Sequence, residues 1–147
     1  MSKEGKKRRR GLRITLIVLT SIIALLVVGS LVALGVTEPE RREGRTVPIV
    51  AVDFAAVPSG TYRGKYEGGM FRWRANEVKV TVANGKVTDI AVVESAVKPV
   101  PEEILEPLFK NVIAAQSLQV DTISQATITS KSYLKSVEDA LTSQSAF

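Results

Sequence analysis

A run of hydroxyl side chains between two segments of helical periodicity is the part of the sequence best suited to chemistry. The run is Asp121–Ser130, and its hydroxyl residues are Thr122, Ser124, Thr127, Thr129 and Ser130. After it, apolar residues recur over residues 130–141 with the spacing of an amphipathic helix. Unpaired amides and the helix dipole favour an anion such as phosphate at that N-terminus, and Lys131 adds positive charge. The alternative is that Thr129 or Ser130 caps the helix and the other hydroxyls lie in a polar loop.

The stretch from Ala115 to Lys131, AQSLQVDTISQATITSK, resembles the C-terminal signature of the FMN-binding domain family. In that family a pattern D-x-x-S/T-G-A-T/S marks the hydroxyl residue to which a flavin transferase attaches FMN through a phosphoester. The residues that match are Asp121, Ser124, Ala126 and Thr127, so the resemblance implies Thr127 as the attachment residue. Gln125 stands where the family has glycine, which reaches positive φ most readily. This departure bears on the loop geometry and on recognition by the transferase.

The resemblance extends over residues 59–141 and implies a function. The family includes extracytoplasmic flavin-carrying subunits of sodium-translocating NADH:quinone reductase and of Rnf complexes, and small membrane-anchored proteins. An electron carrier, rather than a complete enzyme, is therefore expected, with other proteins, quinones or extracellular acceptors as its redox partners. The residues expected around the FMN are Asp121, Ser124, Gln125, Ala126, Thr127, Thr129 and Ser130. Two alternatives remain: FMN bound without a covalent bond, and a cofactor-free extracellular interaction domain.

The pair Gly68-Gly69 is a second place where a flavin could be accommodated. Glycines let a backbone approach a flat ring closely, and the nearby aromatic residues Tyr66, Phe71 and Trp73 offer surfaces for stacking. A pair of glycines at this place is also common in the family that the chain resembles. The alternative is a wide turn beside ordinary core aromatics.

Composition restricts the kinds of chemistry that the side chains themselves can do. The chain has no cysteine and no histidine, which excludes thiol chemistry and the commonest general base and metal ligand. Redox chemistry would therefore need an acquired cofactor. The net charge of +5 does not indicate nucleic-acid binding: residues 1–13 hold seven Lys/Arg and one Glu, a net +6, which leaves −1 for residues 14–147.

The N-terminal part of the sequence predicts a membrane anchor. Residues 1–13 form a basic tail, and the 23 residues of 14–36 carry no charge. At about 1.5 Å per residue, a helix of this length reaches roughly 35 Å, enough to cross a hydrocarbon core of about 30 Å. The basic cluster predicts a single-pass protein of the cell membrane, with a cytoplasmic N-terminus and an extracytoplasmic domain. The alternative is a cleaved signal peptide, although its apolar region usually spans only about 7 to 15 residues.

The remainder predicts a linker followed by one domain. Residues 37–45 are charged without apolar periodicity, which indicates a solvated linker, and 46–58 form an apolar lead-in expected to dock on the domain. We predict a domain over residues 59–147. Its expected strands cover residues 61–66, 70–83 and 86–94, and Asn84-Gly85 predicts a hairpin turn between the last two.

Two helices complete the predicted domain. The first is expected to begin at Pro107 and end near Gln116, with residues 102–106 as a separate turn, because proline disrupts a helix interior. The second covers residues 130–141, and residues 142–147 are expected to fray. The order of elements predicts an α+β fold, an antiparallel sheet with helices packed on one face, preceded by one transmembrane helix.

Overall fold

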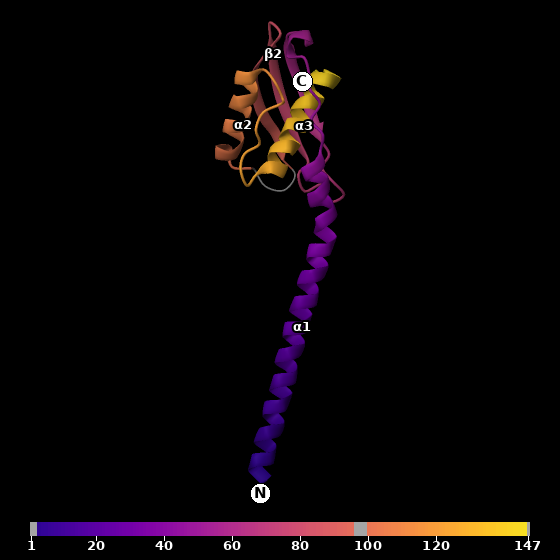
Figure 1. The fold of residues 1–147 in the computed structure, drawn as a ribbon, viewed down its shortest axis with the longest axis vertical. Helices are drawn as coiled ribbons and strands as arrows, with labels where there is room; N and C mark the ends of the chain where they lie inside the picture. Colours follow the sequence, from indigo (N-terminus) through magenta and orange to yellow (C-terminus); the bar gives the residue numbers. More distant parts are fainter. Residues whose placement is uncertain (1–2, 96–99, 147) are drawn as a thin grey trace. The chain divides into compact units, whose positions relative to one another are not determined.

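A computed structural model describes residues 3–95 and 100–146 of the chain (Figure 1). The chain divides into two units, Met1–Pro39 and Glu40–Phe147. Helix α1 (Lys3–Thr46) forms the first unit and continues into the second. The second unit contains the sheet and the other helices, and it begins well before the domain boundary expected at residue 59.

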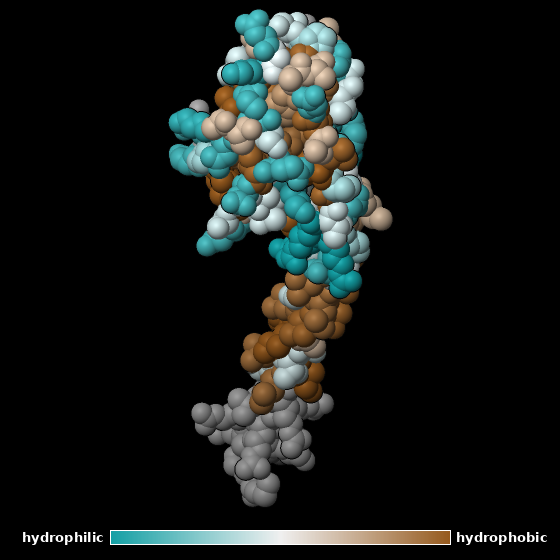
Figure 2. All heavy atoms as spheres, turned by 45° about the horizontal axis from the view of Figure 1, so that its top comes forward, coloured by the Kyte–Doolittle hydropathy of each residue, from teal (hydrophilic) through white to brown (hydrophobic). Residues whose placement is uncertain are grey.

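The stretch of α1 from Ile14 to Val36 has the length and composition of a membrane span. One window within Thr15–Thr46 is long and apolar enough to cross a membrane, and none of it is buried in the protein. Its coloured residues are mostly brown in Figure 2, because apolar side chains cover the helix on the face shown. A helix whose apolar side chains are exposed on all sides needs an apolar environment such as a membrane.

The solvated linker predicted for residues 37–45 is wrong, because α1 remains helical as far as Thr46. Pro39 lies inside this helix, which local sequence preferences disfavour. Contacts within the second unit offset this unfavourable local preference. Glu40 is buried there, and Gly44 packs directly against the side chain of Ile128. The predicted docking of the lead-in is confirmed by two buried residues, Phe54 in a short 3₁₀ helix (Phe54–Ala56) and Val57 directly after it.

Three antiparallel strands form a sheet in the order β1 (Gly60–Tyr66), β2 (Asn76–Ala83) and β3 (Lys86–Ser95). The hairpin predicted at Asn84-Gly85 is confirmed, with φ of 53° and 70° at these two residues. The strand predicted from Met70 is wrong for residues 70–75, which form turns before β2 begins. Arg72 has a φ of 56° there, and the amides on either side of it are bound by Glu40 instead of a neighbouring strand.

Two helices cover the face of the sheet that carries Val78, Val80 and Val82, which confirms the α+β fold. Helix α3 (Thr127–Ser143) packs on β1 and β2, while α2 (Glu102–Ala115) packs on β3. Close approach of α3 needs Gly64, because a Cβ atom there would overlap the backbone oxygen of Ser136. The first residue of α3 is thereby held above the sheet at a defined place.

Both ends of the helical region differ from the prediction. Helix α2 begins at Glu102 with Pro107 inside it, so the start predicted at Pro107 is wrong. Burial of Leu105 with Leu108 and Val112 stabilises the first turn and offsets the missing hydrogen bond. The fraying predicted for residues 142–147 is also wrong as far as the structure describes them. The Arg63 amide, on the open edge of β1, donates a hydrogen bond to the Ser145 oxygen at 2.8 Å.

Candidate functional site

The hydroxyl-rich run folds into a tight turn that leads directly into α3. The Ala126 amide donates to the Ile123 oxygen at 2.9 Å, and Gln125 has a φ of 66° within this turn. Positive φ is the conformation that glycine adopts at little cost and that costs other residues about 1–2 kcal/mol. The position where the family pattern has glycine therefore requires a left-handed residue, and Gln125 adopts that conformation without changing the turn.

Helix α3 begins at Thr127, three residues earlier than predicted. Its N-cap is Ala126, which offers no side-chain hydrogen bond, and the first intrahelical bond joins the Ser130 amide to the Ala126 oxygen at 2.8 Å. The capping alternative for Thr129 or Ser130 is therefore wrong. The amides of Thr127, Ile128 and Thr129 precede the first helical hydrogen bond, so this end of α3 has donors for an anion.

The predicted site residues fall into different environments. Asp121, Ser124, Gln125 and Thr127 are exposed, and Ala126 and Thr129 are partly buried. Ser130 is fully buried, and its hydroxyl accepts a hydrogen bond from the Ile123 amide at 3.2 Å, so this residue holds the loop together. Lys131 was expected near the phosphate, but its amine donates to the Arg45 oxygen at the end of α1, at 2.5 Å.

A cavity of about 210 Å³ lies beside the first turns of α3. Its wall is formed by Trp73, Arg74, Ser95, Val100, Thr129, Ser132 and Tyr133. Ligand pockets commonly measure about 300–1,000 Å³, so this cavity can receive only part of a ligand as large as a flavin nucleotide. Trp73 and Arg74 come from the turn before β2, which therefore contributes to the same site as the hydroxyl-rich run.

Tyr133, one of the residues in the wall of this cavity, carries a buried polar group. Tyr133 is 2 % exposed, and within residues 3–95 and 100–146 its buried oxygen has no hydrogen-bond partner. A buried hydroxyl without a partner costs about 1–3 kcal/mol. The unpaired amides of the first turn of α3 and the Arg74 cation fit a phosphate. The aromatic residues Trp73 and Tyr133 in the cavity wall fit a flat ring system attached to it.

The glycine pair chiefly builds the turn that places Trp73 and Arg74. Gly68 has a φ of 80°, and the Gly69 oxygen accepts a hydrogen bond from the Arg72 amide at 2.9 Å. A Cβ atom on Gly69 would lie 2.8 Å from Cγ of Glu40, so a larger residue would displace that side chain. These contacts favour the structural alternative for Gly68 and Gly69, which act on the site through the turn that follows them.

Glu40 is a residue of this region that the sequence analysis missed. It is 3 % exposed, and its carboxylate accepts hydrogen bonds from the amides of Phe71 at 2.9 Å and Trp73 at 3.2 Å. On the continued helix Glu40 and Gly44 lie four residues apart and share one face, but a carboxylate and a glycine do not form the apolar stripe that indicates a packed helix. Burial is the main cause that raises the pKa of the neighbouring Tyr66 hydroxyl above its usual 10.0. The negative charges of Glu43 and Glu40 raise this pKa further.

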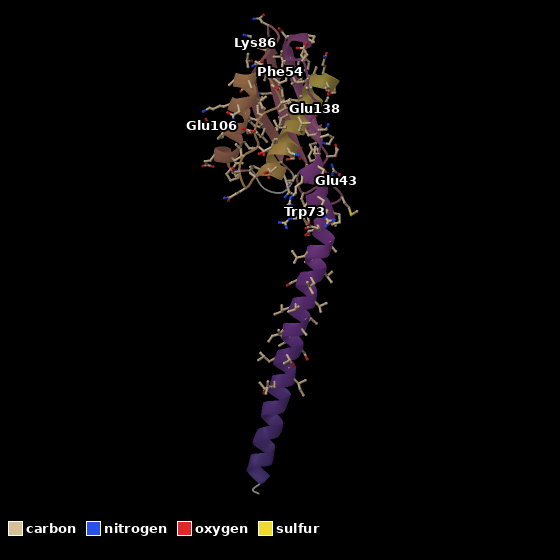
Figure 3. The ribbon with its side chains drawn as sticks, in the orientation of Figure 1. Glu43, Phe54, Trp73, Lys86, Glu106 and Glu138 are labelled. Carbon is tan, nitrogen blue, oxygen red and sulfur yellow. The ribbon has the colours of Figure 1, made fainter. Side chains whose placement is uncertain are left out.

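The last turns of α1 thus contact both halves of the candidate site. Glu40 binds the turn that carries Trp73, and Gly44 packs on Ile128 in the first turn of α3. In Figure 3, Glu43 and Trp73 lie toward one end of the compact unit and Lys86 lies toward the other. A larger cavity of about 510 Å³ between β3 and α2 contains none of the predicted site residues.

Comparison with known proteins agrees with the geometry. Residues 72–142 match the model of a family described as the FMN-binding domain. No curated protein matches the chain. The matched region begins in the turn that carries Trp73 and ends in α3, so it includes both sides of the 210 Å³ cavity. The region of the chain from residue 72 to residue 142 therefore belongs to the FMN-binding domain family, which indicates FMN as its cofactor.

Proposed function

We propose that this chain is a membrane-anchored electron carrier that holds FMN outside the cytoplasm through a phosphoester on Thr127. The proposal rests on the start of α3, where Thr127 is the first helical residue and is exposed. It follows a turn with a positive φ at the place of the family glycine. FMN, when bound, supplies a group that accepts and releases electrons, which no side chain of this chain does readily.

The residues around Thr127 supply what a phosphate needs. The amides of Thr127, Ile128 and Thr129 are donors without helical partners, and the dipole of α3 adds positive potential. Arg74, at the wall of the neighbouring cavity, supplies a cation. Trp73 and Tyr133 line the same cavity and offer aromatic surfaces to the part of the flavin that enters it.

The attachment reaction needs only a nucleophile from this chain. The Thr127 oxygen attacks the phosphorus in the FMN half of FAD, and a new P–O bond forms as the pyrophosphate P–O bond breaks. AMP leaves with the electron pair of the broken bond. The hydroxyl proton passes to a base of the flavin transferase, because the chain has no histidine. Exposure of Thr127 leaves it accessible to such an enzyme.

A covalent tether suits an exported carrier, since a cofactor lost outside the cytoplasm is not readily replaced. The chain has no second redox group of its own, so the electrons come from and go to other molecules. We infer that these partners are redox proteins, quinones or extracellular acceptors. The uncharged span of α1, preceded by a basic tail, supports placement of the domain on the outer side of the membrane.

Non-covalent binding of FMN is the second candidate, and the cavity with Arg74, Trp73 and Tyr133 in its wall favours it. A cation and aromatic surfaces contribute to binding of a flavin nucleotide whether or not an ester is present. In that case the flavin would leave the polypeptide on denaturation. The covalent proposal requires the flavin to remain.

The deciding experiment is intact-protein mass spectrometry after co-expression with a flavin transferase. We expect the mass of one FMN adduct, mapped by peptide analysis to Thr127. Thr127→Val keeps the branched shape without the hydroxyl, so it should fold and show neither adduct nor in-gel flavin fluorescence. Thr129→Val, two residues further along α3, is the matched control and should remain modified. An unmodified wild-type mass, or an adduct on another hydroxyl, would reject the attachment.

A further inference from the structure

The turn before β2 exposes an unusual amount of apolar surface for a domain loop. Met70 is 79 %, Phe71 is 38 % and Trp73 is 42 % exposed. The rings of Phe71 and Trp73 stack with their centroids 5.2 Å apart, so the two aromatics form one surface. We call residues 70–73 the aromatic turn. Exposed apolar patches of this kind mark surfaces that contact a protein or a membrane.

The aromatic turn is held in a defined shape and is not a loose loop. The Glu40 carboxylate binds the amides of Phe71 and Trp73, and the Arg72 amide donates to the Gly69 oxygen at 2.9 Å. Glu40 is itself buried. The side chains of the turn are therefore presented from a fixed backbone, and the group that fixes it belongs to the last turns of α1.

Chain length places Glu40 close to the end of the uncharged span. Only residues 37–39 separate it from Val36, the last residue of that span. Four steps of fully extended chain reach at most about 14 Å. The headgroup layer on each side of a bilayer is roughly 5–8 Å thick, from about 40–45 Å in total and about 30 Å of hydrocarbon. Whatever the orientation of the domain, the tether therefore keeps the aromatic turn near this layer.

We propose that the aromatic turn is a membrane-contact surface, whose Trp73, Phe71 and Met70 side chains enter the headgroup region of the bilayer that α1 crosses. This inference rests on the proposed anchor but not on the proposed flavin attachment. Tryptophan is enriched at this depth because its ring is apolar while its N–H remains near water. Arg74 directly follows Trp73 and supplies a cation for the phosphates of the headgroups. Arg72, between the two aromatic residues, is paired with the carboxylate of Glu67 at 2.7 Å. Contact here would hold the cavity that Trp73 lines at the membrane surface, where a lipid-soluble redox partner is found.

Trp73 is the single tryptophan of the chain, so its fluorescence reports the depth of the turn directly. The full-length protein without flavin is reconstituted into phosphatidylcholine vesicles that carry a doxyl quencher at the headgroup, at acyl carbon 5 or at carbon 12. We expect severalfold stronger quenching by the headgroup and carbon-5 probes than by the carbon-12 probe. We also expect weak quenching by iodide in the aqueous phase.

Variants test whether the neighbouring side chains contribute. The double change Met70→Ser and Phe71→Ser should shift the Trp73 emission to the red and raise quenching by iodide. Val93→Ser on β3 removes an equally exposed apolar side chain and is the matched control, because Val93 is 45 % exposed and lies outside the turn. It should leave the depth profile of Trp73 unchanged.

The outcomes separate this inference from the anchor on which it rests. If the protein floats with the vesicles but Trp73 is quenched by iodide and by no lipid probe, the membrane-contact surface is rejected and the anchor stands. If the protein does not float with the vesicles, the anchor fails and this inference fails with it. The proposed attachment of FMN to Thr127 is tested separately by intact-protein mass spectrometry, so neither the quenching result nor the flotation result decides it.

Discussion

Gln116 and Gln125 both adopt left-handed backbone conformations, and their side chains differ in what they do there. Gln116 has a φ of 48° at the end of α2, where its amide group bonds the backbone of Val87 in both directions at 2.8 Å. Gln125 has a φ of 66° and an exposed side chain. The unfavourable backbone is thus offset by hydrogen bonds at Gln116, whereas Gln125 has no such bonds within the described residues.

Gln125→Gly should therefore raise the free energy of unfolding, by up to about 1 kcal/mol, because relief of the left-handed conformation outweighs the added chain entropy. Gln116→Gly is the control and should lower it, since hydrogen bonds to β3 are lost. Chemical denaturation of the flavin-free proteins measures both. We further expect the glycine at position 125 to raise the flavin-bearing fraction when transferase is limiting. A lower stability of Gln125→Gly would contradict the role assigned to the backbone.

Tyr133→Phe should stabilise the flavin-free domain by roughly 1 kcal/mol, because it removes a buried hydroxyl that has no hydrogen-bond partner among the residues the structure describes. The comparison is Tyr62→Phe, since the Tyr62 hydroxyl donates to the Pro58 oxygen at 2.8 Å and its loss should destabilise. Urea unfolding of both variants is the measurement. In FMN-loaded protein we expect the gain for Tyr133→Phe to disappear. A clear loss of stability in the flavin-free state would mean that the hydroxyl already has a partner.

The last turns of α1 are the element on which the candidate site depends most. Their contacts reach both the turn that carries Trp73 and the start of α3. The charged sequence of this segment gave no indication of burial, because its buried face consists of one carboxylate and one glycine. An apolar stripe, the usual signal of a packed helix, is missing here.

Glu40→Ala should destabilise the compact unit by about 2–3 kcal/mol, since two amides lose a charged acceptor that is almost fully buried. Glu43→Ala is the matched control one turn away, and this exposed residue should tolerate the change with little effect. Thermal unfolding of both variants tests the difference. Equal effects would show that the Glu40 hydrogen bonds contribute nothing specific.

At the level of the whole chain, the asymmetry of charge predicts the orientation in the membrane. The six net positive charges of residues 1–13 should stay in the cytoplasm, which places the residues after Glu38 outside. Protease added to intact cells without an outer barrier should remove the domain and leave a protected fragment that contains the span. Permeabilised cells are the control for access. Protection of the domain in intact cells would show the opposite orientation.

Local patterns were sufficient where one residue type or a regular spacing decides the structure. The uncharged span, the Asn84-Gly85 hairpin and the alternation of β2 needed no distant partner, and each has the predicted form. The hydroxyl-rich run also led to the family whose model matches residues 72–142, and the run lies inside that region. In these cases the determining interactions lie within a few residues of each other along the chain.

Tertiary contacts decided the features that local patterns opposed. Pro39 and Pro107 lie inside helices, since the hydrogen bonds accepted by Glu40 and the burial of Leu105 outweigh the loss of a single helical hydrogen bond. The start of α3 at Thr127 depends on the turn closed by the buried Ser130 hydroxyl. The turn with Trp73 is also fixed by Glu40, whose carboxylate binds the Phe71 and Trp73 amides from more than thirty residues away in the sequence. Such long-range contacts leave no periodic trace in a sequence, so the cavity at the candidate site becomes visible only in the folded chain.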